Sequence, residues 1–231
     1  MVYYLFLILF VVFYVGVLFL MRYFKEGALT NVIFCLNIVI PYLVLVVYLY
    51  FTAGPTNWNF TNALPISNVS QVMFTTCWLG VILPKKVRKY YLSLVALLSL
   101  GMFVAPSIGL CSYGLINYQF HPHFLLDSWA HYALSLWGVY LVFSKQCTLE
   151  LKKVLIGGSI IVTVALTLMI VNVIFDTAFF GLSLNGKHNI YTLVLVDNSY
   201  LSALIYFLGL LGIMALGFFY QRFLNKAFKA C

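Results

Sequence analysis

The chain has 231 residues, of which 64% are hydrophobic and only 8% are charged, and its mean hydropathy is +1.04. Soluble domains carry about 25% charged residues, so this composition excludes a soluble globular protein and predicts an all-α, polytopic membrane protein. The net charge of +8 could indicate nucleic acid as a partner, but the positions of the basic residues, given below, argue against it.

Seven apolar segments are long enough to cross the hydrocarbon core of a bilayer as helices, which takes about 20 residues each. They lie near residues 2–21, 32–52, 68–84, 91–107, 123–143, 153–175 and 199–220. Short loops join them, so residues 1–231 are predicted to form one integral membrane domain. The first segment lacks the basic flank and small-residue cleavage site of a secretory signal, and we expect it to remain as the first helix.

The basic residues predict the orientation of these helices. All lysines and arginines except Lys187 follow the first, third, fifth or seventh segment. Because cytoplasmic loops are enriched in Lys and Arg, we expect the N-terminus outside and the C-terminus in the cytoplasm. The positive charge is then an orientation signal and an attraction to anionic lipid, which indicates membrane lipids and not nucleic acid as partners.

Ionisable residues are concentrated in "HPHFLLDSWAH", residues 121–131. His123, Asp127 and His131 are four residues apart, so they share one face of the predicted helix over about 12 Å. An ionisable group costs at least about 3 kcal/mol if it faces lipid, so this face should turn toward the bundle interior or a water-filled cleft. An imidazole N–H of His131 can donate to Asp127, which fixes the tautomer and raises the basicity of the ring. The predicted catalytic residues are therefore His131 and Asp127.

Other polar residues are expected at the same depth, in the outer half of the bundle. The stretch "PISNVSQ" (65–71) leads into the third segment, and "NVIFD" (172–176) ends the sixth. Together with the start of the fifth segment they predict a polar cleft that opens outward. For the Asn, Gln and Ser residues, interhelical hydrogen bonding is the alternative role. The predicted substrate-binding residues are Ser67, Asn68, Gln71, His123, Asn172 and Asp176.

No metal site and no cofactor are expected. His123 and His131 lie two helical turns apart, too far for both to reach one ion at about 2 Å from each donor. The five cysteines show no C-x-x-C spacing, and the sequence has no G-x-S-x-G or H-E-x-x-H motif.

Short motifs follow one another along the chain: "LP" before the third segment, "MFVAP" ending the fourth, "PHF" opening the fifth, a histidine within it and an asparagine late in the sixth. Their order resembles the YwaF family of bacterial integral membrane proteins, which is related to the transmembrane protein 164 acyltransferase. The resemblance covers about residues 55–180. It implies a bacterial plasma membrane protein that transfers phospholipid acyl chains, with a cysteine as acyl acceptor and the embedded histidine as its base. The position of that cysteine is Val69 here, and "DTAFF" (176–180) departs from the family's late Asn-Tyr. The matching positions are Leu64-Pro65, Pro106 at a helix end, Pro122-His123-Phe124, His131 and Asn172.

Three functions remain open from the sequence. The first is a lipid-directed acyltransferase in which His131 is the base, Asp127 orients it, and Asn68 or Asn172 polarises a carbonyl. The second is a catalytically altered relative that keeps the fold. The third is a small-molecule binding or transport subunit whose outward cleft holds an amphipathic ligand.

Overall fold

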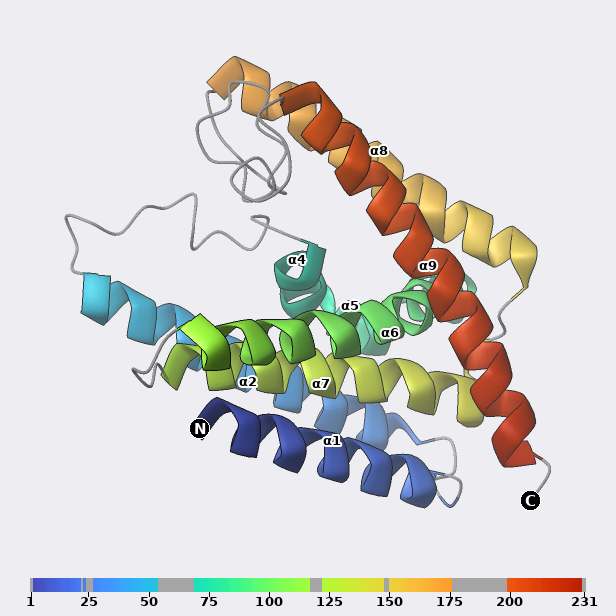
Figure 1. Cartoon of the computed structure of the whole chain (residues 1–231). Helices are drawn as coiled ribbons and strands as arrows, with labels where there is room; N and C mark the ends of the chain where they lie inside the picture. Colours follow the sequence, from blue (N-terminus) through green and yellow to red (C-terminus); the bar gives the residue numbers. More distant parts are fainter. Residues whose placement is uncertain are drawn as a thin grey trace.

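All regular secondary structure in the described part of the chain is helical. A computed structural model describes residues 2–21, 23, 27–53, 69–116, 122–147, 150–175 and 199–229. Within these ranges the regular structure consists of helices, as the sequence predicts (Figure 1). They are α1 (Val2–Met21), α2 (Ala28–Ala53), α4 (Val69–Thr76), α5 (Leu79–Ile82), α6 (Lys85–Ile116), α7 (Pro122–Phe143), α8 (Leu151–Phe175) and α9 (Ser199–Lys229).

Five of these helices are long and apolar enough to cross a membrane. The candidate spans are Tyr3–Met21, Ala28–Thr52, Lys85–Cys111, Leu155–Phe175 and Phe207–Ala227. Large hydrophobic side chains are exposed along them, for example Phe13, Ile40 and Phe175, as expected for contact with lipid tails. The chain is therefore a membrane protein, whereas the number of seven spans and the orientation of the termini stay predictions.

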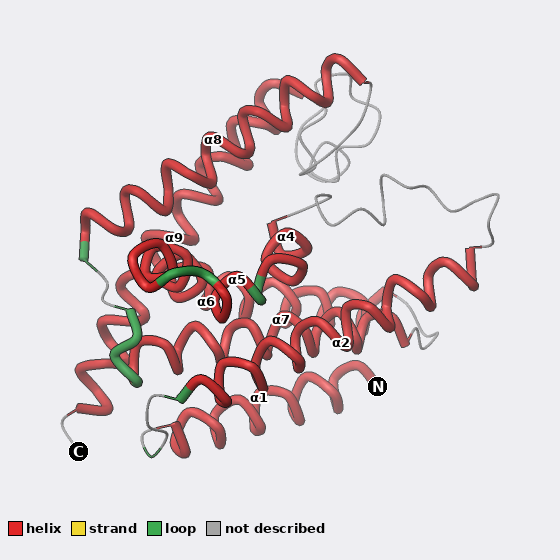
Figure 2. Tube along the Cα trace, turned by 180° about the vertical axis from the view of Figure 1, so that it is seen from behind, coloured by secondary structure: helices red, strands yellow, loops and turns green. Residues whose placement is uncertain are grey.

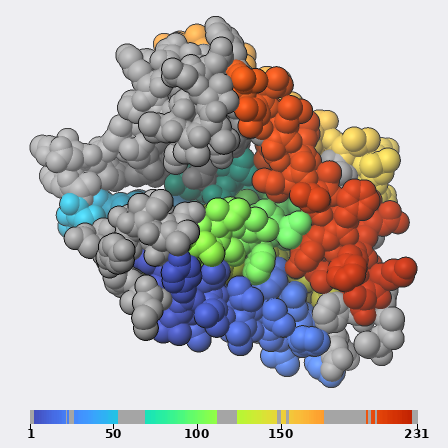
Figure 3. Space-filling model, viewed as in Figure 1, coloured from blue at the N-terminus to red at the C-terminus, as the bar shows by residue number. Residues whose placement is uncertain are grey.

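Helix α7 has a lower hydropathy than these five spans because of its polar residues, and it lies in the middle of the bundle. Every residue from Ala130 to Val142 is buried, so no side of this part of α7 faces lipid. Helices α1, α2, α4, α6 and α9 all contact it. Figure 2 shows α7 between neighbouring helices from behind, and in Figure 3 helices α1, α6 and α9 form most of the described surface on the front face.

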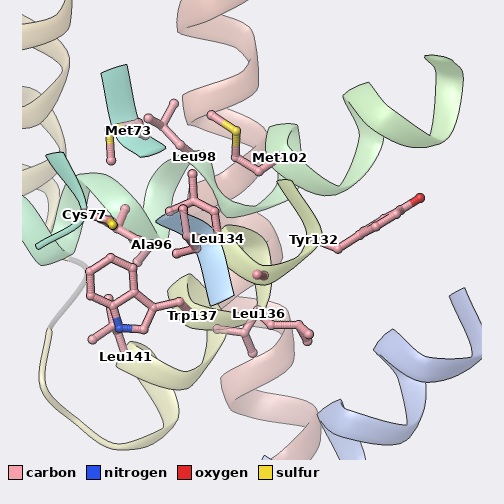
Figure 4. Packing of buried hydrophobic residues seen from close by; sticks show 14 of the residues in the cluster. Met73, Cys77, Ala96, Leu98, Met102, Tyr132, Leu134, Leu136, Trp137 and Leu141 are labelled. Atoms are coloured by element: carbon pink, nitrogen blue, oxygen red, sulfur yellow. The ribbon is translucent and has the colours of Figure 1, made fainter. Parts of the chain in front are cut away.

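The hydrophobic core surrounds α7. Trp137 and Leu134 are fully buried, and Leu98 of α6 packs into the same cluster (Figure 4). Lipid tails are as apolar as leucine, so such a core gains little from excluding water and depends on close van der Waals packing. The fit between helices therefore matters more here than the apolar area buried.

Two glycines allow α6 to approach its neighbours closely. On α7, a Cβ at Gly138 would lie 2.9 Å from the Val95 carbonyl oxygen and 2.7 Å from the Ser99 Cβ. On α9, a Cβ at Gly217 would overlap the Leu97 carbonyl oxygen. Small residues at helix contacts are the usual means by which membrane helices pack backbone to backbone.

Buried polar side chains fix the rotation of α7 against its neighbours. The Tyr14 hydroxyl of α1 lies 2.8 Å from the Ser135 hydroxyl of α7. Ser135 donates to the Ser99 carbonyl of α6 at 2.6 Å, and Gln221 Nε2 of α9 donates to the Ser99 hydroxyl at 2.6 Å. Two residues further along α7, the Trp137 indole donates to Asn31 Oδ1 of α2 at 3.0 Å. Because these bonds come from helices on different sides, they define which way each face of α7 points.

The predicted segment 68–84 differs from the structure, which has two short helices there. Helix α4 ends at Thr76, α5 begins at Leu79, and Cys77 and Trp78 form a turn between them. Thr75 Oγ1 donates to the Gln71 carbonyl at 2.9 Å and Thr76 Oγ1 to the Val72 carbonyl at 2.6 Å. Such back-bonding by Thr hydroxyls competes with the helical ladder and bends helices, so a single straight helix was the wrong expectation.

The expectation that Pro106 ends a helix is also wrong. Pro106 lies inside α6, which extends past both ends of the predicted segment 91–107. Proline cannot donate to the carbonyl one turn earlier, but neighbouring side chains can satisfy backbone groups near such a site. Here Ser107 Oγ donates to the Phe103 carbonyl at 2.7 Å and lies 2.8 Å from the Tyr132 hydroxyl of α7. The bounds of α1, α7 and α8 agree with the predicted segments to within two residues.

The close contact of α9 with α6 gives a stability prediction. Gly217→Ala places a methyl group on the Leu97 carbonyl, so we expect it to lower the free energy of unfolding by about 1–3 kcal/mol. The control is Gly209→Ala on the same helix, where a Cβ meets nothing within 4 Å and the gain in helix propensity is up to about 1 kcal/mol. The thermal unfolding midpoints of the two variants in detergent measure these changes in stability. Equal midpoints for the two variants would contradict the packing of α9 on α6.

Candidate functional site

Helices α4, α6 and α7 line an open cavity of about 220 Å³. Helix α4 contributes one hydroxyl side chain, α6 an apolar wall, and α7 a wall that is mostly polar. The volume suits a polar group of a ligand with a few attached methylenes. The lining residues are Ser70, Ala105, Pro106, Gly109, Leu110, Phe124, Asp127, Ser128 and His131.

His131 is held by its own helix. Its Nδ1 lies 2.8 Å from the backbone carbonyl oxygen of Asp127 and 3.4 Å from Asp127 Oδ2. A carbonyl oxygen only accepts hydrogen bonds, so Nδ1 carries the proton and donates it. In the neutral ring, Nε2 is then the unprotonated, basic nitrogen. Since Nδ1 turns back to the helix, the Nε2 edge of the ring is the one left to the cavity.

His131 donates to the backbone carbonyl of Asp127, whereas the sequence predicts a bond to the Asp127 carboxylate. The sequence predicts a bond from the imidazole to Asp127, and the structure brings the two side chains within 3.4 Å. That distance is longer than an ordinary N–H···O bond, whereas the carbonyl at 2.8 Å is within the usual range. The carbonyl therefore fixes the tautomer, and the partly exposed carboxylate adds a negative charge beside the ring.

Aromatic rings close the inner side of this site. The Phe74 ring of α4 meets the His131 ring edge-on, with centroids 4.8 Å apart. Tyr42 of α2 packs against Phe74 with centroids 5.4 Å apart, and its buried hydroxyl has no hydrogen-bond partner within the described ranges. These contacts hold the imidazole plane and keep His131 only 7% exposed.

Ser70 of α4 and Ser128 of α7 line the cavity. Ser70 precedes Phe74 by one turn, so it lies on the side of α4 that contacts His131. Val69, the position at which the resembling family has its cysteine, packs instead against both hydrophobic clusters, including Ala165 of α8. The side chain that α4 presents to the cavity is thus Ser70 and not Val69.

The structure brings only part of the predicted site together. Asp127 and His131 line the cavity, whereas Gln71 and the buried Asn172 do not belong to its lining. The His123 backbone lies in the first turn of α7, but its side chain lies outside the described residues. The predicted residues that lie wholly outside the described ranges are Ser67, Asn68 and Asp176.

Sequence reasoning missed Ser128, Gly109 and the apolar lining from α6. Ser128 precedes His131 by three residues, so helical spacing alone could have put it on the same face. Gly109 carried no comparable signal, because only the packing of α6 on α7 brings it to the cavity. For metals, the described ranges contain no group of three or more His, Cys, Asp or Glu side chains that could hold an ion.

No family model, no curated protein sequence and no solved structure matches the chain. The resemblance to the YwaF family therefore stays a prediction. The function has to be argued from the cavity and its residues.

The tautomer of His131 can be measured directly. In protein labelled with ¹⁵N-histidine, we expect the neutral His131 ring to show the shift of a protonated nitrogen at Nδ1 and that of an unprotonated one at Nε2. Asp127→Asn should keep this pattern, because the backbone carbonyl at 2.8 Å remains. A ring protonated at Nε2 in the wild-type chain would contradict the assignment.

Proposed function

We propose that this chain is a lipid-directed acyltransferase of the membrane in which His131 is the general base. The observation that supports this most is the held imidazole: Nδ1 donates to the Asp127 carbonyl, and the basic Nε2 is left to a cavity lined by hydroxyls and apolar side chains. A base positioned in this way accelerates proton transfer by about 10²–10⁴-fold. The apolar wall from Ala105 and Leu110 suits the first methylenes of an acyl chain.

In the proposed reaction, Ser70 is the acyl acceptor in the place of the family's cysteine. Its hydroxyl oxygen attacks the ester carbonyl of an acyl lipid while His131 Nε2 takes the hydroxyl proton. The tetrahedral intermediate collapses to an acyl ester on Ser70, and the released lysolipid alcohol leaves with the proton from His131. A second lipid hydroxyl then attacks the Ser70 ester, giving up its proton through the same nitrogen.

Ser128 is the proposed donor to the carbonyl oxygen during these steps. It lies on the same wall as His131 and is almost completely buried, so its hydroxyl faces little competition from water. A donor in such a site stabilises the negative charge that develops on the carbonyl oxygen. Ser128 takes the place of Asn68 or Asn172, which the sequence suggested for this role.

We further propose that the chain crosses the bacterial plasma membrane seven times, with α4 and α5 as one broken span and the N-terminus outside. The described basic residues support this arrangement. Lys85 and Lys86 begin α6, Lys145 follows α7, and Lys152 begins α8. Figure 1 shows these helix ends on one side of the molecule, which is the side expected to face the cytoplasm.

The role of His131 predicts the effect of its removal. His131→Ala should lower acyl transfer between phospholipids by at least about 10²-fold in purified protein reconstituted in lipid, because the base is lost. The thermal unfolding midpoint measured in parallel separates this effect from misfolding. Unchanged turnover in a folded variant would remove His131 from the mechanism, and a folded variant that lost a co-purifying ligand would favour a binding subunit.

Filling the cavity tests the same function without touching the base. Gly109 lines the cavity, and a Cβ there meets nothing within 4 Å, so the helix tolerates a side chain at this position and Gly109→Leu would take up space in the cavity. We expect it to abolish lipid turnover and to leave the His131 tautomer unchanged. Gly209→Leu on α9 is the matched control, since that position is also open but lies away from the cavity. Full turnover by Gly109→Leu would exclude this cavity as the substrate site.

The orientation can be tested at the start of α6. Lys86→Cys, in a chain whose other cysteines are replaced by serine, should be shielded from a membrane-impermeant thiol reagent added to intact cells. It should react after the cells are opened. Rapid labelling by reagent added outside would show that the start of α6 faces outward and would contradict the proposed orientation.

A further inference from the structure

Two buried thiols from separate parts of the chain lie next to each other. Cys35 lies on α2, and Cys77 lies in the turn between α4 and α5. Cys35 Sγ donates to the Cys77 carbonyl at 3.4 Å, and Cys77 Sγ points to the Cys35 carbonyl at 3.9 Å. Each sulfur thus lies beside the backbone of the other residue. This reciprocal arrangement places the two thiols side by side in the core, which is the first requirement for a disulfide between them.

The position of Cys77 allows its backbone to adjust to a disulfide. It is in a two-residue turn and not within a continuous helix, so its backbone is not fixed by a helical ladder on both sides. Its thiol also donates to the Phe74 carbonyl at 3.2 Å, a weak bond that a new covalent link would replace. Figure 4 shows Cys77 within the packed core, where it is fully buried, while Cys35 is 7% exposed.

We propose that Cys35 and Cys77 are a peroxide-sensitive modification site, at which hydrogen peroxide converts the thiol pair into a disulfide that joins α2 to the turn between α4 and α5. Hydrogen peroxide is small and uncharged, so it can reach thiols that charged reagents cannot. The site does not depend on the reaction proposed for His131.

The chemistry balances with peroxide as the oxidant. The Cys35 thiol takes one oxygen atom from hydrogen peroxide, which gives a sulfenic acid and one water. The Cys77 sulfur then attacks the Cys35 sulfur, the S–O bond breaks, and the hydroxyl leaves with the Cys77 proton as a second water. Two thiols have lost two electrons to one peroxide, and one S–S bond has formed.

A disulfide here would also act on the cavity. Phe74 lies one turn before Cys77 and meets the His131 ring at 4.8 Å. The link would remove the Cys77 bond to the Phe74 carbonyl and fasten that end of α4 to α2. Oxidation should therefore change the surroundings of the His131 ring, which makes the thiol pair a means of regulating the site.

The test is peroxide treatment of the purified, reduced full-length chain in lipid nanodiscs, followed by blocking of free thiols and digestion without reductant. We expect mass spectrometry to find the Cys35 and Cys77 peptides joined, with the loss of two hydrogen atoms, and a reductant to separate them. The ¹⁵N shifts of His131 should change on oxidation and return on reduction.

Serine variants provide the matched controls. Cys35→Ser and Cys77→Ser should each abolish the linked peptide and the change at His131, whereas Cys111→Ser on α6 should preserve both. The proposal is overturned if the wild-type chain keeps both thiols free, if Cys35 is oxidised to a sulfinic acid while Cys77 stays free, or if either residue pairs with another cysteine. The peroxide test on the wild-type chain stays valid even if a serine variant does not fold.

Discussion

A helix that carries Asp127 and His131 can lie within this bundle only if protein, and not lipid, surrounds it. Leaving an ionisable side chain in hydrocarbon costs several kcal/mol, which is comparable with the net stability of a whole domain. His131 meets this condition, because every residue from Ala130 to Val142 is buried. The side chain of Asp127 is 39% exposed and lines the cavity instead. The burial of α7 requires close neighbours, and the backbone contacts made possible by Gly138 and Gly217 bring α6 and α9 near enough to provide them.

Enclosure alone would not point His131 into a cavity. The bonds from Tyr14, Ser99 and Asn31 to α7 come from three other helices, and a rotation of α7 would break all of them. Each is worth roughly 0.6 kcal/mol in a membrane, so none is decisive singly, but together they select one rotation. With that rotation fixed, the bond of Nδ1 to the Asp127 carbonyl leaves Nε2 as the basic nitrogen. The buried hydrogen bonds of α7 therefore determine which way the His131 ring points.

The parts of the fold that depend on local composition could be predicted from the sequence. The lengths of apolar runs gave α1, α7 and α8, and the cost of an ionisable group in lipid gave the inward orientation of His131. The break at Cys77 and the continuation of α6 through Pro106 could not be predicted, because hydropathy does not report hydrogen bonds between side chains and carbonyls. The cavity lining needed the packing of three helices, which no local pattern encodes.

The offset between Val69 and Ser70 shows how much depends on that packing. Adjacent residues on a helix point about 100° apart, so a one-residue difference decides which side chain meets the cavity. Val69 packs against Ala165 of α8, whereas Ser70 lines the cavity together with His131. In the proposed reaction, the valine at the position of the resembling family's cysteine therefore still leaves a hydroxyl on α4 as the acyl acceptor. A serine hydroxyl is far less acidic than a thiol and depends more strongly on a neighbouring base. If Ser70 is the acyl acceptor as proposed, the fixed tautomer of His131 is thus a stricter requirement than it would be for a cysteine in that place.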